Sequence, residues 1–302
     1  MSSTIEKALQ RQQQAKRDAE KATTLEKAAA VSQTASEAVP VKPARAPQQQ
    51  PEKLPETKPF EIDLEKLASK GLISLTGART QINEEYREIK RKLIGNAFGP
   101  ISSTLNNSNI IMVTSGRPSE GKTFTAANLA LSIASEQDKT VLLVDADVLK
   151  PNVLNTLGLE KRAGLMEYLL GEVEDISDVL YHTNVDKLKI IPAGRSHHLS
   201  TELLASQKMQ DTVNEFANRY PDRIVIFDTP PLIGITESAV LANFAGQAVV
   251  VTEEGKSKLS DIRHAVERLN PNMAIGFVVN KSVNNDAEGT GYYGYYYAER
   301  EE

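Results

Sequence analysis

Residues 116–123 read GRPSEGKT and stand between a short apolar run and a helical pattern. Their spacing matches G-x-x-x-x-G-K-S/T, the pattern of a phosphate-binding loop. In such a loop the backbone amides and the helix N-terminus point at phosphate oxygens, and the helix dipole favours negative charge there. Gly116 and Gly121 allow the tight turn, Lys122 can bridge the β- and γ-phosphates, and Thr123 can place its hydroxyl on Mg²⁺. We therefore predict a nucleotide site in preference to a plain glycine-rich turn.

Three carboxylates follow two other apolar runs. Asp145 and Asp147 come at the end of the run TVLLV, and Asp228 closes the run RIVIF. Ligands of a parallel sheet bind beyond the carboxyl ends of its strands, so the carboxylates should lie near the loop. They could hold Mg²⁺ or accept a proton from an attacking hydroxyl. An ordinary acidic turn or helix cap is the alternative for the first pair. Loop and carboxylates together predict a Mg-nucleotide site.

The chain ends in GYYGYYYAEREE, residues 291–302. Five of the nine tyrosines lie in this stretch, although aromatic residues make up only 5% of the chain. A phenol hydroxyl is an acceptor for phosphoryl transfer once a base takes its proton, because its pKa of about 10 keeps it protonated at neutral pH. An aromatic docking patch is the alternative. The five tyrosines are Tyr292, Tyr293, Tyr295, Tyr296 and Tyr297.

Short β-branched runs alternate with amphipathic helical patterns from residue 108 onward. Such alternation predicts right-handed βαβ crossovers and an α/β fold with a mostly parallel central sheet flanked by helices. The expected strands are 109–115, 140–147, 188–194, 223–229, 247–253 and 274–282, and helical patterns include 124–136, 209–220 and 258–269.

Composition divides the chain into four expected parts. Residues 1–59 are polar and Pro-rich, which predicts a disordered extension, with a capping pattern compatible with a short helix near 3–20. A helical lead-in is expected over 60–107, the nucleotide-binding core over 108–283, and a flexible tail over 284–302. There are no cysteines and no apolar run of about 20 residues. With a net charge of −5, we expect a cytosolic protein that binds no nucleic acid.

The loop and the carboxylates resemble those of the deviant-Walker P-loop ATPases, the group that includes MinD and ParA. Arg117 stands where that group has its signature lysine. The residues are more similar to the bacterial tyrosine kinases, which carry a Glu at the position of Glu120. Their second motif is similar to Val144-Asp145-Ala146-Asp147 followed by Lys150-Pro151. The resemblance runs from about residue 80 to the end.

The stretch EEYREIKRK, residues 84–92, is similar to the E-x-x-R-x-x-R oligomerisation motif of the same family. Glu84 and Arg87 fit the motif, and Lys90 replaces its last arginine. The resemblance implies a helix that packs against a neighbouring subunit in a ring. A solvated helix with internal ion pairs is the alternative. The N-terminal extension, together with this motif, looks most like the branch of these kinases that is associated with exosortase-linked exopolysaccharide systems.

The resemblance implies an ATP-dependent autokinase that phosphorylates the tail tyrosines between subunits and regulates exopolysaccharide or capsule biosynthesis and export. Lys122, Asp145 and Asp147 would be catalytic, with Asp145 as first choice of base and an exchange of roles with Asp147 left open. Mg²⁺ would be held by Thr123, Asp147 and Asp228. ATP contacts are expected from Gly116, Arg117, Pro118, Ser119, Glu120, Gly121, Lys122, Thr123, Phe124 and Asn280.

The expected partners are other copies of the chain, a membrane protein of the polysaccharide co-polymerase type that activates the kinase, and a tyrosine phosphatase. Through that activator the protein would lie at the inner face of the plasma membrane. Two other functions fit the same nucleotide site. One is a MinD/ParA-like positioning ATPase without kinase activity, and the other is a nucleotide-gated scaffold. An ATPase of that kind often ends in an amphipathic membrane helix or makes basic DNA contacts, whereas this chain ends in Gly, Tyr and Glu.

Overall fold

The computed structural model describes residues 58–75 and 80–282. The expected extension over 1–59 and the five tail tyrosines lie almost wholly outside these residues, and the expected domain boundaries stay predictions. Among the described residues no helix is long and apolar enough to cross a bilayer.

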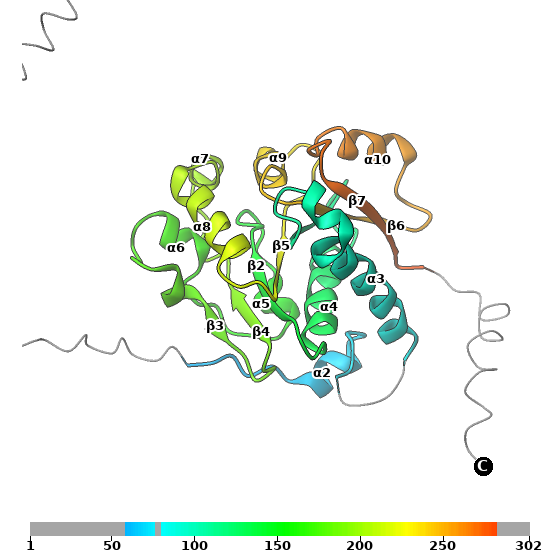
Figure 1. Ribbon diagram of the computed structural model, residues 1–302, viewed down its shortest axis with the longest axis horizontal. Helices are drawn as coiled ribbons and strands as arrows, with labels where there is room; N and C mark the ends of the chain where they lie inside the picture. The colour runs from blue at the N-terminus through cyan, green and yellow to red at the C-terminus, as the bar shows by residue number, and fades with distance from the viewer. Residues whose placement is uncertain (1–57, 76–79, 283–302) are drawn as a thin grey trace, which may run out of the picture. The chain divides into compact units, whose positions relative to one another are not determined.

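A seven-stranded sheet forms the centre of the fold, in the order β3-β4-β2-β5-β1-β6-β7 (Figure 1). All pairings are parallel except that between β3 and β4. The prediction of a mostly parallel sheet is confirmed. The strands are β1 Ile110–Ser115, β2 Thr140–Asp145, β3 Tyr181–His182, β4 Leu188–Ile191, β5 Arg223–Asp228, β6 Gln247–Glu253 and β7 Ala274–Asn280.

All six expected strands are present, and most end earlier than the sequence pattern suggested. Strand β2 stops at Asp145, because the next residues turn away toward the short helix α5, and β4 stops at Ile191, directly before Pro192. A proline lacks the amide that a central strand donates to its neighbour. Strand β3 was not expected, since two residues give no periodicity to detect.

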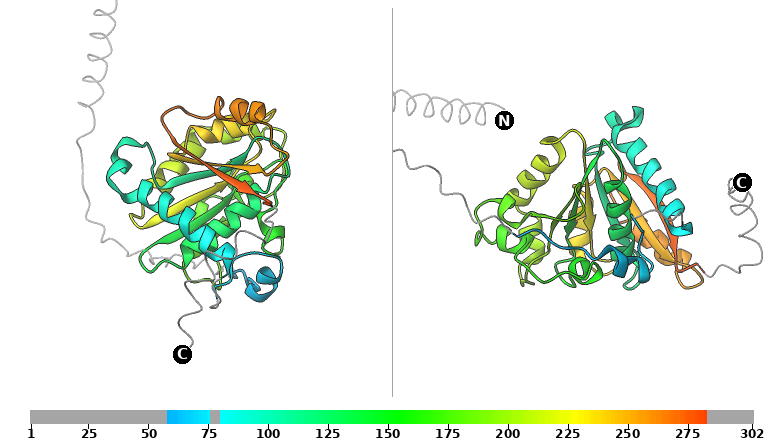
Figure 2. Two further views of the ribbon diagram at one scale, coloured as in Figure 1. Left: turned by 90° about the vertical axis from the view of Figure 1, so that its right-hand side faces the viewer. Right: turned by 90° about the horizontal axis from the view of Figure 1, so that it is seen from below.

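Helices cover both faces of the sheet (Figure 2). The longer helices begin at side-chain caps or at the end of the loop 116–121, which places α4 directly behind that loop. The helices are α2 Leu64–Ser69, α3 Gln81–Phe98, α4 Lys122–Ala134, α5 Val153–Thr156, α6 Leu165–Leu169, α7 Ser200–Leu204, α8 Gln207–Asn218, α9 Thr236–Ala242 and α10 Leu259–Val266, with 3₁₀ turns η1 Pro100–Thr104 and η2 Ile176–Val179.

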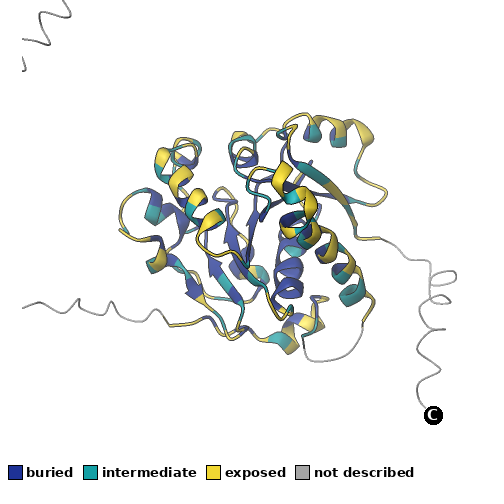
Figure 3. Cartoon of the chain, in the orientation of Figure 1, coloured by how far each residue is buried: buried dark blue, intermediate teal, exposed yellow. Residues whose placement is uncertain are grey.

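Two apolar clusters lie on the two faces of the sheet. Alternate residues of the central strands enter one cluster or the other, as the two-residue period of a strand requires. One cluster joins the sheet to α2, α3, α4 and α5, and the other joins it to α6, α8, α9 and α10. The central strands β1, β2, β5 and β6 are therefore buried on both sides (Figure 3), which is why their sequences are almost wholly apolar. The edge strand β7 is partly exposed.

Candidate active site

The phosphate-binding loop connects β1 to α4 at the carboxyl edge of the sheet. Two of its residues take left-handed backbone conformations, Ser119 with φ 69° and Gly121 with φ 101°. A Cβ atom on Gly121 would lie 1.9 Å from Asn280 Nδ2. Both the conformation and the close approach therefore require glycine at position 121.

Side chains at the end of β7 hold the carbonyl groups of this loop. Asn280 Nδ2 donates to the Glu120 carbonyl at 2.9 Å, and Lys281 Nζ donates to the Ser119 carbonyl at 2.7 Å. The peptide bonds among the described residues are trans, so the amide that follows each carbonyl points the opposite way. The amides of Glu120 and Gly121 are thus directed away from β7, as a phosphate cradle requires.

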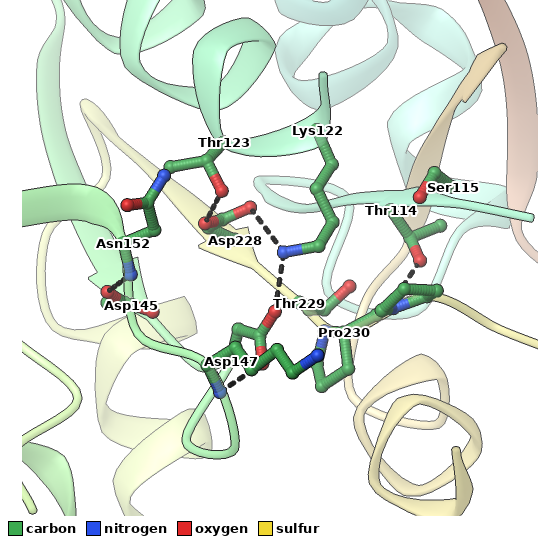
Figure 4. Close-up of polar contacts among 12 residues, drawn as sticks. Thr114, Ser115, Lys122, Thr123, Asp145, Asp147, Asn152, Asp228, Thr229 and Pro230 are labelled. Atoms are coloured by element: carbon green, nitrogen blue, oxygen red, sulfur yellow. Dashed lines mark hydrogen bonds and ion pairs between the residues drawn. The ribbon is translucent and has the colours of Figure 1, made fainter. Parts of the chain in front are cut away.

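Lys122 lies among three carboxylates from two strand ends (Figure 4). Its Nζ is 2.5 Å from Asp147 Oδ2 and 3.8 Å from Asp228 Oδ1. Burial alone lowers the pKa of Lys122, but Asp228, Asp147 and Asp145 outweigh it and raise the pKa above its usual value. The lysine is therefore charged, and it is held where a nucleotide phosphate could replace a carboxylate as its partner.

Asp145 is the most deeply buried of the acids that follow β2, with 1% of its surface exposed. Its Oδ2 accepts hydrogen bonds from the amides of Asn152 at 3.1 Å and Val153 at 3.0 Å. Its Oδ1 has no hydrogen-bond partner. Burial first, and then the charge of Asp228, raise the pKa of Asp145 to about 8. A carboxyl group with such a pKa changes its protonation state near neutral pH, as a general acid or base must.

Thr123 and Asp228 meet at the ends of α4 and β5. Thr123 Oγ1 donates to Asp228 Oδ2 at 2.7 Å, while the buried Asp228 Oδ1 accepts no hydrogen bond. Among the described residues there is no cluster of three or more acidic, His or Cys side chains suited to a metal. Mg²⁺ at phosphoryl-transfer sites needs only one or two carboxylates besides phosphates and water. The hydroxyl and the carboxylate oxygen that accepts no hydrogen bond therefore fit Mg²⁺. Asp147 binds Lys122 instead, and its expected metal role stays a prediction.

Arg117 points away from the phosphate cradle toward α10. Its Nε donates to Asp261 Oδ2 at 2.5 Å and its Nη2 to Asp261 Oδ1 at 3.1 Å, a bidentate pair. Its backbone amide donates to Glu120 Oε2 at 2.7 Å. Within this subunit Arg117 therefore ties the loop to α10. No sequence pattern singled out Asp261, because an acid that pairs with a distant arginine cannot be told from one that faces solvent on an amphipathic helix.

The three residues of the expected oligomerisation motif lie on α3, but their surroundings differ. Arg87 is half-exposed and forms an ion pair with Glu84. Lys90 is buried, donates to the Ser132 carbonyl at 2.8 Å and lies 2.7 Å from Glu136 Oε1. Lys90 thus joins α3 to α4 inside the subunit. The role of the motif between subunits stays a prediction, and Glu84 and Arg87 offer the more accessible side chains.

The remaining expected nucleotide contacts stay predictions. Pro118 is exposed at the tip of the loop, and Phe124 packs against the apolar cluster beside α4. Asn280 is another of the expected ATP contacts, and its amide nitrogen donates to the Glu120 carbonyl.

Removing the side-chain amide of Asn280 should weaken nucleotide binding. We expect Asn280→Ala to raise the Kd of an ATP analogue about 5-fold, which corresponds to one loop hydrogen bond of about 1 kcal/mol. Fluorescence titration measures this. The matched control is Asn243→Ala, because Asn243 is an exposed residue that donates to the Ala239 carbonyl. Equal affinities in the two variants would contradict the supporting role of Asn280.

Comparison with known proteins identifies the family. A sequence family described as an AAA domain matches residues 108–275, more than half of the chain. Tyrosine-protein kinase YwqD of Bacillus subtilis is 31% identical over 227 residues, which cover 74% of this chain and 92% of YwqD. The chain belongs to the bacterial tyrosine kinases.

Two further proteins that are similar to this kinase are also described as kinases. The putative tyrosine-protein kinase EpsB of Ralstonia nicotianae is 33% identical over 188 residues, which cover 62% of this kinase and 24% of EpsB. The kinase therefore spans about a quarter of that relative's length. The solved VpsO kinase domain has a TM-score of 0.55 and 26% identity, covering 68% of this kinase and 100% of that domain. The expected family resemblance and the P-loop fold are confirmed.

Proposed function

We propose that this kinase transfers the γ-phosphoryl group of ATP to the tail tyrosines of a neighbouring copy, and so regulates exopolysaccharide or capsule biosynthesis and export. The observation that carries the proposal is the meeting of Lys122, Thr123 and Asp228 behind one phosphate-binding loop. Family membership supports tyrosine as the acceptor. The acceptors are Tyr292, Tyr293, Tyr295, Tyr296 and Tyr297, which lie outside the described residues.

The reaction requires a positioned hydroxyl and a proton acceptor. The tyrosine oxygen forms a bond to the γ-phosphorus, and the bond from that phosphorus to the bridging oxygen of ADP breaks. The products are phosphotyrosine and ADP, and the phenolic proton passes to a carboxylate. Lys122 and the loop amides hold the phosphates in line. Mg²⁺, held by Thr123 and Asp228 with Asp147 as a further candidate ligand, supplies charge neutralisation when it is bound.

Asp145 remains the first choice of base. One of its oxygens is fixed by two amides and the other has no hydrogen-bond partner. Asp147, the alternative, already pairs with Lys122 and accepts from the Lys150 amide at 3.0 Å. Asp145 therefore has a fixed orientation with one oxygen left for a proton.

The partners follow from the family resemblance. We propose a membrane activator of the polysaccharide co-polymerase type, a tyrosine phosphatase, and a ring of copies of this chain in contact through α3. The kinase would then act at the inner face of the plasma membrane, held there by the activator.

A mixing experiment tests transfer between copies. One full-length copy carries Lys122→Met and keeps its tyrosines, and the other keeps Lys122 but has all five tail tyrosines changed to Phe. We expect mass spectrometry to find phosphotyrosine in the Lys122→Met copy after incubation of the mixture with Mg-ATP and the activator. The Lys122→Met copy alone is the control.

Two results would contradict the proposal. The first is phosphorylation of wild-type tails without any phosphotyrosine in the Lys122→Met copy of the mixture. In that case each copy would phosphorylate only its own tail. ATP turnover by the wild type without any phosphotyrosine would favour the positioning ATPase.

A further inference from the structure

A hollow, which we call the basic pocket, lies at the opposite end of β5 from the candidate active site. It has a volume of about 620 Å³ and is bordered by β3, β4, η2 and the end of α8. Arg223 begins β5 and lines this pocket, whereas Asp228 ends β5 at the ATP site. A strand of this length separates the two by about 17 Å. The basic pocket is thus distinct from the nucleotide site.

Arg223 is a buried cation that forms no ion pair within the described residues, although the more distant charge of Asp222 and a side-chain hydrogen bond with Tyr220 favour its charged form. Only 6% of its surface is exposed, and its guanidinium carbon lies 3.8 Å from the centre of the Tyr220 ring. Among the ion pairs within residues 58–75 and 80–282, none involves Arg223. Burial lowers the pKa of its guanidinium. A buried cation with no carboxylate in direct contact is costly, and an anion from outside would offset that cost.

Other charges around the basic pocket are mainly positive. Lys58, Lys189 and Arg219 line it together with Arg223. Glu215 is the acid of the lining, and it forms an ion pair with Arg219. The adjacent Asp222 accepts a hydrogen bond from the Thr140 hydroxyl at 3.0 Å and is absent from the lining. Cations therefore outnumber acids, and the pocket is suited to an anion.

The apolar part of the lining indicates which kind of anion fits. Leu180, Phe216 and Tyr220 lie in the same pocket as the cations. Phe216 is buried, while Tyr220 presents its ring beside Arg223. A free phosphate would bind the guanidinium without contacting these apolar side chains. An aromatic ring that carries a phosphate would use both, because arginine pairs with phosphate bidentately and aromatic rings pack against one another.

We propose that the basic pocket binds phosphotyrosine in the phosphorylated C-terminal segment, residues 291–302, of this kinase. This inference rests on the proposed function, which makes that segment the phosphate acceptor. The segment carries five tyrosines, three glutamates and one arginine, so its charge is complementary to the pocket even before phosphorylation. Each phosphate adds about −1.5 to −2 charges. Binding there removes the reaction product from the carboxylate-rich ATP site and shields it from a phosphatase.

Peptide binding to the full-length chain tests the proposal. The protein carries Lys122→Met, so that its own tail stays unmodified. The probe is a synthetic peptide of residues 291–302 with phosphate on Tyr295. We expect saturable binding, at least about 10-fold weaker binding of the unphosphorylated peptide, and a loss of about 10- to 100-fold in Arg223→Gln. Phenyl phosphate should displace the peptide at lower concentration than inorganic phosphate.

Matched variants separate recognition from folding. Arg268→Gln removes the same charge from an exposed position beyond α10 and should leave affinity unchanged. Arg223 is buried, so thermal unfolding checks that its variant folds. If Arg223→Gln unfolds, a double variant with Lys189→Gln and Arg219→Gln, at less buried positions, replaces it as the test. We expect the double variant to lose affinity by a similar factor.

Three outcomes overturn the proposal. They are equal affinity for both peptides, unchanged affinity in the folded pocket variants, and Arg223-dependent binding to phosphatidylglycerol vesicles without binding to the peptide. The probe is made chemically, so these outcomes do not depend on whether the kinase modifies its own tail. A failure of tail phosphorylation in the mixing experiment is thereby distinguishable from a failure of the pocket.

Discussion

Lys122→Met is expected to reduce tail phosphorylation by about 100- to 1000-fold, the usual cost of losing one preorganised group that stabilises transition-state charge. Lys122 lies within 4 Å of Asp147 and Asp228 before any nucleotide binds. In the proposed reaction the same ammonium group would bridge phosphate oxygens of ATP. A methionine of similar length fills the space but carries no charge. Quantitative mass spectrometry of the tail in the presence of Mg-ATP and the activator measures the effect.

The same change should also lower the stability of the nucleotide-free protein. Removing one partner of a buried ion pair leaves the other charge uncompensated, which costs about 3–5 kcal/mol. Lys161→Met is the control, because Lys161 is exposed. Phosphorylation of Lys122→Met within a few-fold of wild type would show that the loop does not act on the transferred phosphoryl group.

Asp145→Asn is expected to stabilise the nucleotide-free protein and at the same time abolish phosphorylation. The folded protein holds Asp145 with a pKa of about 8, far above the ordinary value of 3.8. Folding therefore favours the protonated form. The stability linked to this group is fully present below pH 4 and is lost as the pH rises through 8. Asparagine accepts the same amide hydrogen bonds and does not ionise.

The stabilising effect of Asp145→Asn should therefore grow with pH. We expect the gain in unfolding free energy to increase by about 1.4 kcal/mol per pH unit between pH 4 and pH 8 and to level off above pH 8. Urea unfolding in buffer with a chelator and without nucleotide measures it. Asp186→Asn, at an exposed position between β3 and β4, should show no such trend. A pH-independent difference for Asp145→Asn would contradict the raised pKa.

The fold and the loop could be predicted from the sequence because both depend on local patterns. Buried parallel strands require apolar runs, and a phosphate cradle requires glycine followed by Lys122 and Thr123 at fixed spacing. The ends of the strands were less certain, since the pattern of TVLLVDAD does not say where the backbone turns. The two-residue strand β3 lay below what periodicity can detect.

The contacts that hold the loop in place could not be predicted, because they join residues far apart in the chain. Asp261 pairs with Arg117 across 144 positions, and Lys281 reaches Ser119 across 162. For Lys90 a local sequence pattern is present, but it does not show that the side chain is buried. Both interpretations of its charged stretch, a contact with a neighbouring subunit and a solvated helix, place Lys90 at the surface of the subunit, but the packing of α3 on α4 buries it. The pairing of Arg223 with Tyr220 likewise depends on the turn after α8.

The attachment of Asn280 and Lys281 to the phosphate-binding loop has a mechanical consequence. Both residues stand at the very end of β7, immediately before the segment that carries the tyrosines. Under the proposed function, a pull on a tail whose tyrosine is held by a neighbouring copy would be transmitted through these two hydrogen bonds to the phosphate-binding loop. Capture of the acceptor by a neighbouring copy would then loosen the loop that is proposed to bind ATP.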